Sequence, residues 1–229
     1  MQIYNAKLLN IDPIEVRRYA GLRKAENFKE SSIIDACDEA QLLIDVKGVW
    51  NIYNYNSQSQ MILSEPPVLI EGKSIGKHLE KCDKVICIAV TVGEEIEQEV
   101  SKRFDKGEYV SSVLLDAAAT TAVEQAADSM EKTIEQQVSR DGYTMRWRYS
   151  PGYGDWPLTQ QPELFRLANA EKIGMQLSSA MMLIPRKSIT AIIGLVKKST
   201  NKTPNSKHDC AACDKIDCPS RKVDNDVKK

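Results

Sequence analysis

The apolar and polar positions of the chain alternate between helical and strand spacings over its first 197 residues. The longest helical pattern runs over Glu108–Ser139, where apolar and small residues recur every three or four positions. Lys84–Val92 is apolar on both faces and rich in β-branched residues, which predicts a central strand. Val49–Tyr55 and Ser188–Val196 also have strand character. Because these elements do not follow a regular βαβ order, the pattern predicts an α+β domain with one twisted, largely antiparallel sheet flanked by helices.

Shorter helices are predicted around this framework. Asp12 and Pro13 form a helix start, since Asp can cap the helix and Pro fits its first position. A helical stripe near residues 31–40 contains Cys37, and Cys87 lies in the central strand, so both are expected to be core residues. The run Ala117–Ala122 has small side chains, which favours close packing of the long helix on the sheet.

The segment after the long helix has the most distinctive pattern. Tyr143–Tyr149 alternates as a strand would, which places Arg146 and Arg148 on one face. Pro151 and Gly152 follow, and this dipeptide is typical of a type II turn because Gly accepts a positive φ at its third position. Such a turn is expected to expose backbone groups at the end of the sheet.

The composition and net charge of the chain argue against several classes of protein. The chain has 229 residues, with 42% hydrophobic and 28% charged residues and a formal net charge of −1. This balance argues against a nucleic-acid partner recognised through bulk positive charge, and against a polybasic membrane binder. The longest apolar runs are shorter than the ~20 residues that span a bilayer, and no secretory signal opens the sequence. A cytoplasmic protein is therefore expected.

The charge is unevenly distributed along the chain. From Lys197 onward there are nine Lys/Arg and five Asp/Glu, whereas the preceding 196 residues carry 22 basic and 27 acidic groups. The C-terminal part is also poor in large apolar residues, so it buries too little surface to offset the entropy of ordering. We therefore expect one domain over residues 1–197 and a polar tail over residues 198–229.

The strand–turn segment carries the candidate chemistry. Arg148 can form a bidentate pair with a carboxylate. Tyr149, Tyr153 and Trp156 offer flat faces for a base or a sulfonium. These groups together suit a zwitterionic, adenine-bearing small molecule. A tight aromatic hairpin without a ligand is an equally valid interpretation of the spacing alone.

At this point the sequence resembles a known family. Arg148-Tyr149-Ser150-Pro151-Gly152-Tyr153 is similar to the Arg-x-x-Pro-Gly-Tyr motif of the activation (reactivation) domain of vitamin B12-dependent methionine synthase. The stretch from Glu171 to Met182, followed by Pro185 and Ser188–Ala191, resembles the same domain downstream. The resemblance covers roughly residues 80–197 and is most specific around residues 146–195.

The resemblance implies a fold, a ligand and a role. The family domain binds S-adenosylmethionine in a shallow groove and docks over a cobalamin domain whose cobalt has become inert by oxidation. An electron from a reductase and the methyl group of S-adenosylmethionine then restore methylcobalamin. By motif position Arg148 binds the ligand's carboxylate, and a Glu on the preceding long helix also contacts the ligand. The implied ligand-binding residues are Arg148, Ser150 (Ala in the family, acting through its backbone), Gly152, Tyr153 and Glu124, with Asp128 as the alternative to Glu124 one turn further on.

The sequence also departs from the family. Gly154–Leu158 replaces the family's Pro/Cys-containing stretch, and no Asp-x-His-x-x-Gly cobalamin signature is present. The expected protein is thus a free-standing activation domain that meets its corrinoid partner in trans. That partner is a cobalamin-binding methionine synthase or another corrinoid protein, served by an electron-donating reductase. Whether the chain counts as an enzyme by itself stays open.

The tail contains a second candidate site. Cys210, Cys213 and Cys218 form a Cys-x2-Cys-x4-Cys pattern, which suits zinc or an iron–sulfur cluster. His208 is near enough in sequence to be a fourth zinc ligand. The alternatives are a tail with adventitious thiols, a non-catalytic docking module, and a redox partner that delivers the electron through a tail cluster.

Overall fold

The computed structural model describes residues 1–5, 8 and 10–198, and it has the α+β architecture that the sequence predicts. The tail cysteines Cys210, Cys213 and Cys218 and their neighbour His208 lie outside the described residues. The main sheet has the order β4-β3-β2-β5-β9-β6, with β1 paired to β2, and every pairing is antiparallel. Its strands are β1 Gln2–Tyr4, β2 Lys47–Asn56, β3 Met61–Ile62, β4 Val68–Leu69, β5 Lys84–Thr91, β6 Tyr143–Met145 and β9 Ser188–Lys197.

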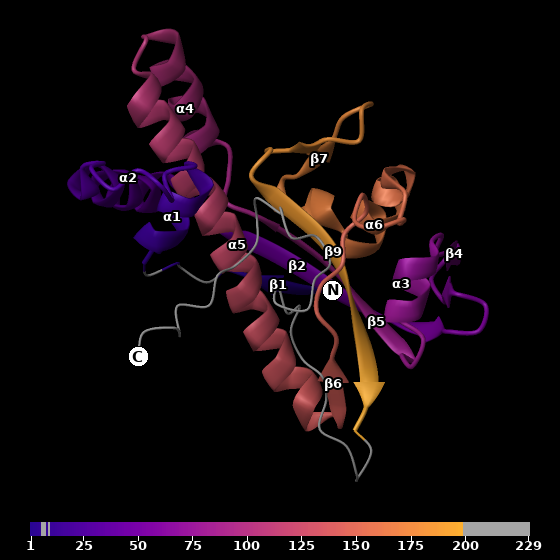
Figure 1. Cartoon of the computed structure of the whole chain (residues 1–229). Coiled ribbons are helices and arrows are strands. Elements are labelled where there is room, and N and C mark those ends of the chain that lie inside the picture. Colours follow the sequence, from indigo (N-terminus) through magenta and orange to yellow (C-terminus); the bar gives the residue numbers. More distant parts are fainter. Residues whose placement is uncertain (6–7, 9, 199–229) are drawn as a thin grey trace.

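The two faces of the sheet are covered by different sets of helices (Figure 1). The long helix α5 Tyr109–Arg140 runs along one face with α1 Pro13–Tyr19, α2 Glu30–Leu43 and α4 Glu95–Asp105. The opposite face carries α3 Lys73–His78, the 3₁₀ turns η1 Leu158–Gln160 and η2 Ala170–Ile173, and α6 Gln161–Ala168. A separate hairpin joins β7 Gln176–Leu177 to β8 Leu183–Ile184.

The central strand β5 explains why two helical layers form. Every residue from Val85 to Thr91 is buried, with alternate side chains directed to the two cores. Cys87 is fully buried in the core on the α6 side, and Cys37 and Cys82 are also buried. The prediction that Cys37 and Cys87 are core residues is therefore confirmed.

Small residues hold α5 close to the sheet. Ala118, Ala119 and Ala122 are fully buried. The Thr121 hydroxyl donates a hydrogen bond to the Ala117 carbonyl within the helix. A small side chain allows the helix axis to approach the strands closely. These residues are buried in the core that α5 shares with the sheet and the neighbouring helices, which agrees with the predicted close packing.

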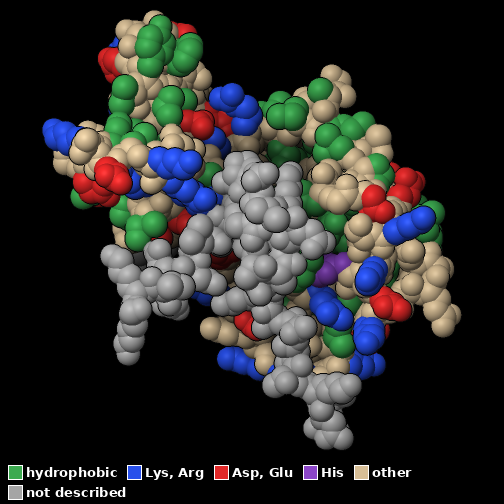
Figure 2. All heavy atoms as spheres, in the orientation of Figure 1, with side chains coloured by type: hydrophobic (Ala, Val, Ile, Leu, Met, Phe, Trp, Pro, Cys, Tyr) green, Lys and Arg blue, Asp and Glu red, His purple; other side chains and the backbone are tan. Residues whose placement is uncertain are grey.

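The far end of the α4–α5 hairpin extends past the core. Phe104, Tyr109, Val110 and Val113 are each more than half exposed. Figure 2 shows hydrophobic side chains gathered at this end of the molecule. An open groove of about 440 Å³ lies between α2 and this hairpin, and none of its lining residues belongs to the Pro151-Gly152 turn. None of the helices within residues 1–5, 8 and 10–198 combines the length and the hydropathy of a bilayer-spanning segment.

Candidate functional site

The strand that leads into the candidate site contains one extra residue. Met145 pairs with Leu195, and Tyr149 forms a bridge with Ile192. The five residues from Met145 to Tyr149 therefore lie opposite only four residues of β9, from Leu195 to Ile192. One extra residue on one strand of a pair defines a β-bulge. The regular strand ends at Met145 instead of Tyr149.

This bulge turns the two arginines to opposite faces of the sheet. Arg146 lies over Gly194 beside Cys82, in the layer of α3 and α6. Arg148 points to α5 on the other face. The prediction that Arg146 and Arg148 share a face is wrong, because the extra residue shifts the alternation by one position.

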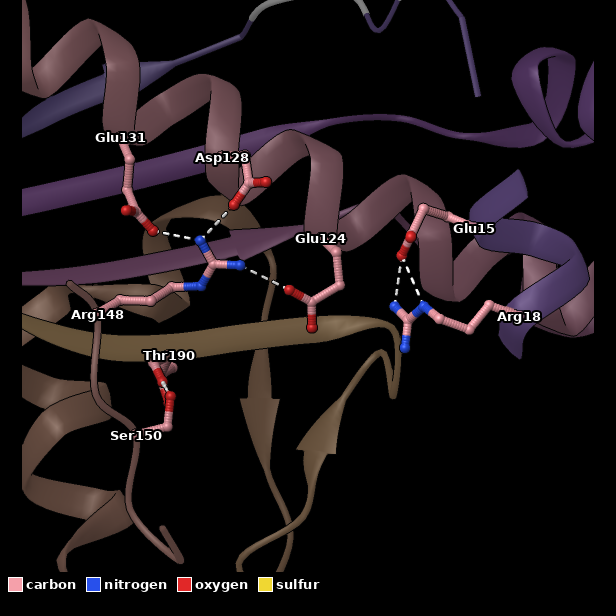
Figure 3. A network of polar contacts seen from close by, with 8 residues as sticks. All are labelled: Glu15, Arg18, Glu124, Asp128, Glu131, Arg148, Ser150 and Thr190. Atoms are coloured by element: carbon pink, nitrogen blue, oxygen red, sulfur yellow. Dashed lines mark hydrogen bonds and ion pairs between the residues drawn. The ribbon is translucent and has the colours of Figure 1, made fainter. Parts of the chain in front are cut away.

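Arg148 contacts three carboxylates of α5 (Figure 3). Its Nη2 lies 2.6 Å from Glu124 Oε2, and its Nη1 lies 2.6 Å from Asp128 Oδ1. Nη1 also contacts Glu131 Oε1. The spacing of these acids, four and then three residues, places them on one face of the helix.

The cluster has an excess of negative charge, since three carboxylates face one guanidinium. The side chains of Arg148 and Glu131 are only 21% and 20% exposed, whereas those of Glu124 and Asp128 are 38% and 44% exposed. Burial alone would lower the pKa of Arg148, but Glu131 and Asp128 raise it above its ordinary value. Burial raises the pKa of Glu131 although Arg148 opposes this change. Glu131 is thus the most weakly solvated carboxylate of the three.

The turn after the bulge has the predicted geometry. The Tyr153 N–H donates to the Ser150 carbonyl at 3.1 Å, and Gly152 has a φ of +90°. With Pro151 in the second position this is a type II turn. The Ser150 hydroxyl donates to the Thr190 carbonyl at 2.8 Å, which fastens the turn to β9 (Figure 3). The Gly152 N–H donates to the Trp156 carbonyl, so part of the backbone that we expected to be exposed is bonded within the loop.

The aromatic residues around the turn separate into two groups. Tyr153 is 59% exposed, whereas Tyr149 and Trp156 are only 7% and 2% exposed. The Trp156 indole N–H donates to Gln160 Oε1 at 2.6 Å, inside the core between the sheet and α6. The expectation that Tyr149 and Trp156 offer faces to a ligand is therefore wrong, because both rings fill the core under the turn.

The surface around Arg148 also includes Tyr153 and the end of α1. Partial burial and Glu124 raise the pKa of Tyr153, whereas Arg148 lowers it, so the phenol lies within electrostatic reach of the cluster. Burial and Glu124 likewise raise the pKa of Tyr19 on α1. One surface thus combines an arginine, several carboxylates and an exposed aromatic ring.

The structure brings together most of the residues that the sequence singled out. Glu124 and Asp128 were alternatives, and both contact Arg148. Glu131 was missed, although its position seven residues after Glu124 on the same helix was a usable signal. Within the described part of the chain, no group of three or more His, Cys, Asp or Glu side chains is arranged to hold a metal ion.

Comparison with known proteins gives three findings. The family model described as vitamin B12 dependent methionine synthase, activation domain, matches residues 75–201. A crystal structure described as the MetH reactivation domain bound to AdoHcy superposes with a TM-score of 0.60 at 15% sequence identity, covering 88% of this chain and 81% of that chain. No curated protein matches the sequence. The family model spans more than half of the chain, includes the Arg148–Tyr153 motif, and agrees with the fold, so this chain belongs to the family of vitamin B12-dependent methionine synthase activation domains.

Proposed function

We propose that this chain binds S-adenosylmethionine beside Arg148 and supports reductive methylation of a corrinoid protein that acts in trans. The observation that carries the proposal is the cluster of Arg148 with Glu124, Asp128 and Glu131 next to the Pro151-Gly152 turn. The related fold of the reactivation domain, which is described as bound to AdoHcy, supports the choice of ligand.

The charges of the cluster suit the charges of this ligand. S-adenosylmethionine has one carboxylate and two cationic groups, an ammonium and a sulfonium. Arg148 can pair with the carboxylate, while Glu124 and Asp128 can face the cations. Tyr153 offers an exposed ring for the sulfonium or the adenine. Ser150 and Gly152 line the same turn and complete the proposed ligand-binding set.

The residues of this chain bind and orient the methyl donor. In the proposed reaction a reductase supplies one electron to the partner's cob(II)alamin, and the methyl group then moves from the sulfonium to cobalt, leaving S-adenosylhomocysteine. The partner carries the cobalamin, and it is a cobalamin-binding methionine synthase or a related corrinoid protein. The chain itself needs no general acid or base for this transfer.

Calorimetric titration with S-adenosylmethionine tests the binding step. We expect saturable heat with the wild-type chain and a loss of affinity of at least tenfold for Arg148→Ala, since the ligand carboxylate loses its charged partner. Arg186→Ala removes an exposed arginine that faces Glu97 and is the matched control. Equal affinity in the two variants would refute the role of Arg148.

The reactivation step needs a partner protein. Candidate corrinoid proteins in the cob(II)alamin form are mixed with the chain, a reductant and S-adenosylmethionine, and the cobalt spectrum is followed. Formation of methylcobalamin that requires both the chain and the methyl donor supports the proposal. A complex that forms equally well without S-adenosylmethionine, with no change in the cobalt spectrum, would indicate a non-catalytic docking module instead.

The thiol spacing of the tail favours a second element of the proposal. We propose that Cys210, Cys213 and Cys218 bind zinc, with His208 as a fourth ligand, or an iron–sulfur cluster that passes the electron. Metal analysis and a visible spectrum of anaerobically purified protein distinguish the two. Absence of both zinc and iron would exclude this element, and it would leave the ligand site unaffected.

A further inference from the structure

Arg148 contacts three carboxylates of its own chain, so a ligand carboxylate that binds to Nη1 competes with them. Glu131 and Asp128 both contact Nη1, and Glu124 contacts Nη2. A bidentate carboxylate needs two N–H groups on one edge of the guanidinium. The two N–H groups of Nη1 already contact Asp128 and Glu131, so a ligand carboxylate that binds to Nη1 displaces one of these two acids.

The three acids differ in how they respond to loss of the arginine. Glu124 and Asp128 are more than one third exposed, and water can replace the guanidinium around them. Glu131 has 20% of its side chain exposed, and water replaces its partner less well. A buried carboxylate that loses its cation becomes neutral by taking up a proton, because burial disfavours the charged form.

We propose that Glu131 is an internal competitor for Arg148, and that S-adenosylmethionine binding transfers the guanidinium from Glu131 to the ligand while Glu131 takes up a proton from solvent. This inference rests on the proposed function of the site and adds its regulation. The step is a proton uptake alone, with no covalent or redox change. It makes ligand affinity fall as pH rises.

The groups that surround Glu131 support this assignment. Arg148, on the segment after β6, interacts electrostatically with Glu131. Asp128 and Glu124, on the same helix as Glu131, also interact with it. Burial and these two acids raise the pKa of Glu131, whereas Arg148 lowers it. When Arg148 turns to the ligand, the groups that raise the pKa remain, so the proton is bound more strongly. On the α1 side, Glu124 acts electrostatically on Tyr19, and Glu15 is paired with Arg18 (Figure 3).

Proton uptake distinguishes this role from simple charge repulsion. Calorimetric titrations with S-adenosylmethionine at pH 7 in buffers of different ionisation enthalpy give the number of protons bound per ligand. We expect uptake of about 0.3–1 proton and an affinity that falls up to about tenfold per pH unit between pH 6 and 8. In Glu131→Gln, which keeps the shape of the side chain, we expect no uptake, a flat pH profile and an affinity at pH 8 raised about tenfold.

A matched control lies one turn further along the same helix. Glu135 is exposed, and Glu135→Gln removes the same charge from α5. We expect this variant to keep the proton uptake and the pH profile of the wild type. If both variants bind S-adenosylmethionine more tightly and both keep the proton uptake of the wild type, the loss of a negative charge on α5 alone explains the affinity. That result would overturn the proposal.

The outcomes also separate this inference from the proposed function. Saturable binding without proton uptake in the wild type overturns the role of Glu131 and leaves the ligand site standing. Proton uptake that persists in Glu131→Gln would show that a group other than Glu131 binds the proton, and it would also overturn the role of Glu131. Absence of binding in the wild type and in Glu131→Gln alike overturns both proposals.

Discussion

Arg148→Ala is the substitution whose effect on folding stability follows most directly from the structure. It removes the guanidinium from Glu124, Asp128 and Glu131. Loss of one partner from a fully buried ion pair costs about 3–5 kcal/mol, and an exposed pair is worth about 0–1 kcal/mol. Because Glu131 keeps 20% of its side chain exposed and the other two acids more than one third, we expect a loss of about 2–3 kcal/mol in the free energy of unfolding at pH 7.

The pH dependence of this loss has a defined sign. Without Arg148 the pKa of Glu131 in the folded chain rises further above its value in the unfolded chain, since burial already raises it. The folded state then holds the proton more strongly, and stability falls as pH rises above the unfolded value of about 4.3. The gap in stability between wild type and Arg148→Ala should therefore be small near pH 4. It should widen until the pH exceeds the folded pKa of Glu131.

Urea denaturation between pH 4 and pH 8, followed by circular dichroism, measures this gap. In the double variant Arg148→Ala/Glu131→Gln we expect at least about half of the lost stability to return at pH 7, because no unpaired carboxylate remains buried. Lys47→Ala is the control, because its pair with Asp45 is exposed on both sides and should contribute less than about 1 kcal/mol. A loss that does not vary with pH, or one that Glu131→Gln fails to reduce, would refute this account of the cluster.

Three further predictions concern the packing around the site. Gly154→Ala should destabilise the chain more than Gly152→Ala in thermal denaturation. Both positions have a positive φ, but only at Gly154 does an added Cβ clash with the Tyr149 hydroxyl. Trp156→Phe should cost about 1–2 kcal/mol in urea denaturation because Gln160 loses a buried hydrogen bond, and an unchanged midpoint would contradict this. Cys37, Cys82 and Cys87 should react with a thiol reagent at pH 8 only when the chain unfolds, because all three are buried and burial raises the pKa of each thiol. Fast labelling of all six cysteines in the folded chain would contradict these buried positions.

The regular elements of the fold were predictable because their sequence patterns are local. The stripe of small and apolar residues predicted Glu108–Ser139, and the helix spans Tyr109–Arg140. The apolar run at Lys84–Val92 predicted the central strand, which spans Lys84–Thr91. Gly152 has the positive φ that the Pro-Gly pair predicted. In each case the residues that determine the element lie within it.

The orientation of the site residues was harder to predict because it depends on strand pairing. The alternation of Tyr143–Tyr149 is regular in the sequence, and the extra residue appears only when β9 is placed beside it. Burial of Trp156 likewise depends on Gln160 and the core under the turn. The spacing of Glu131 places it on the same face of α5 as Glu124. The sequence does not show that Arg148 lies against this face, and the structure does.

The bulge and the small residues of α5 together account for the position of the acidic cluster. The bulge turns Arg148 toward α5, but a guanidinium reaches the helix only where the helix lies close to the sheet. Buried alanines at 118, 119 and 122 provide that closeness immediately before Glu124. Because residues three and four positions apart lie on one face of a helix, Asp128 and Glu131 follow Glu124 on the same face of α5. In the proposed complex, a ligand carboxylate would therefore meet an arginine whose three carboxylate partners all lie on one helix.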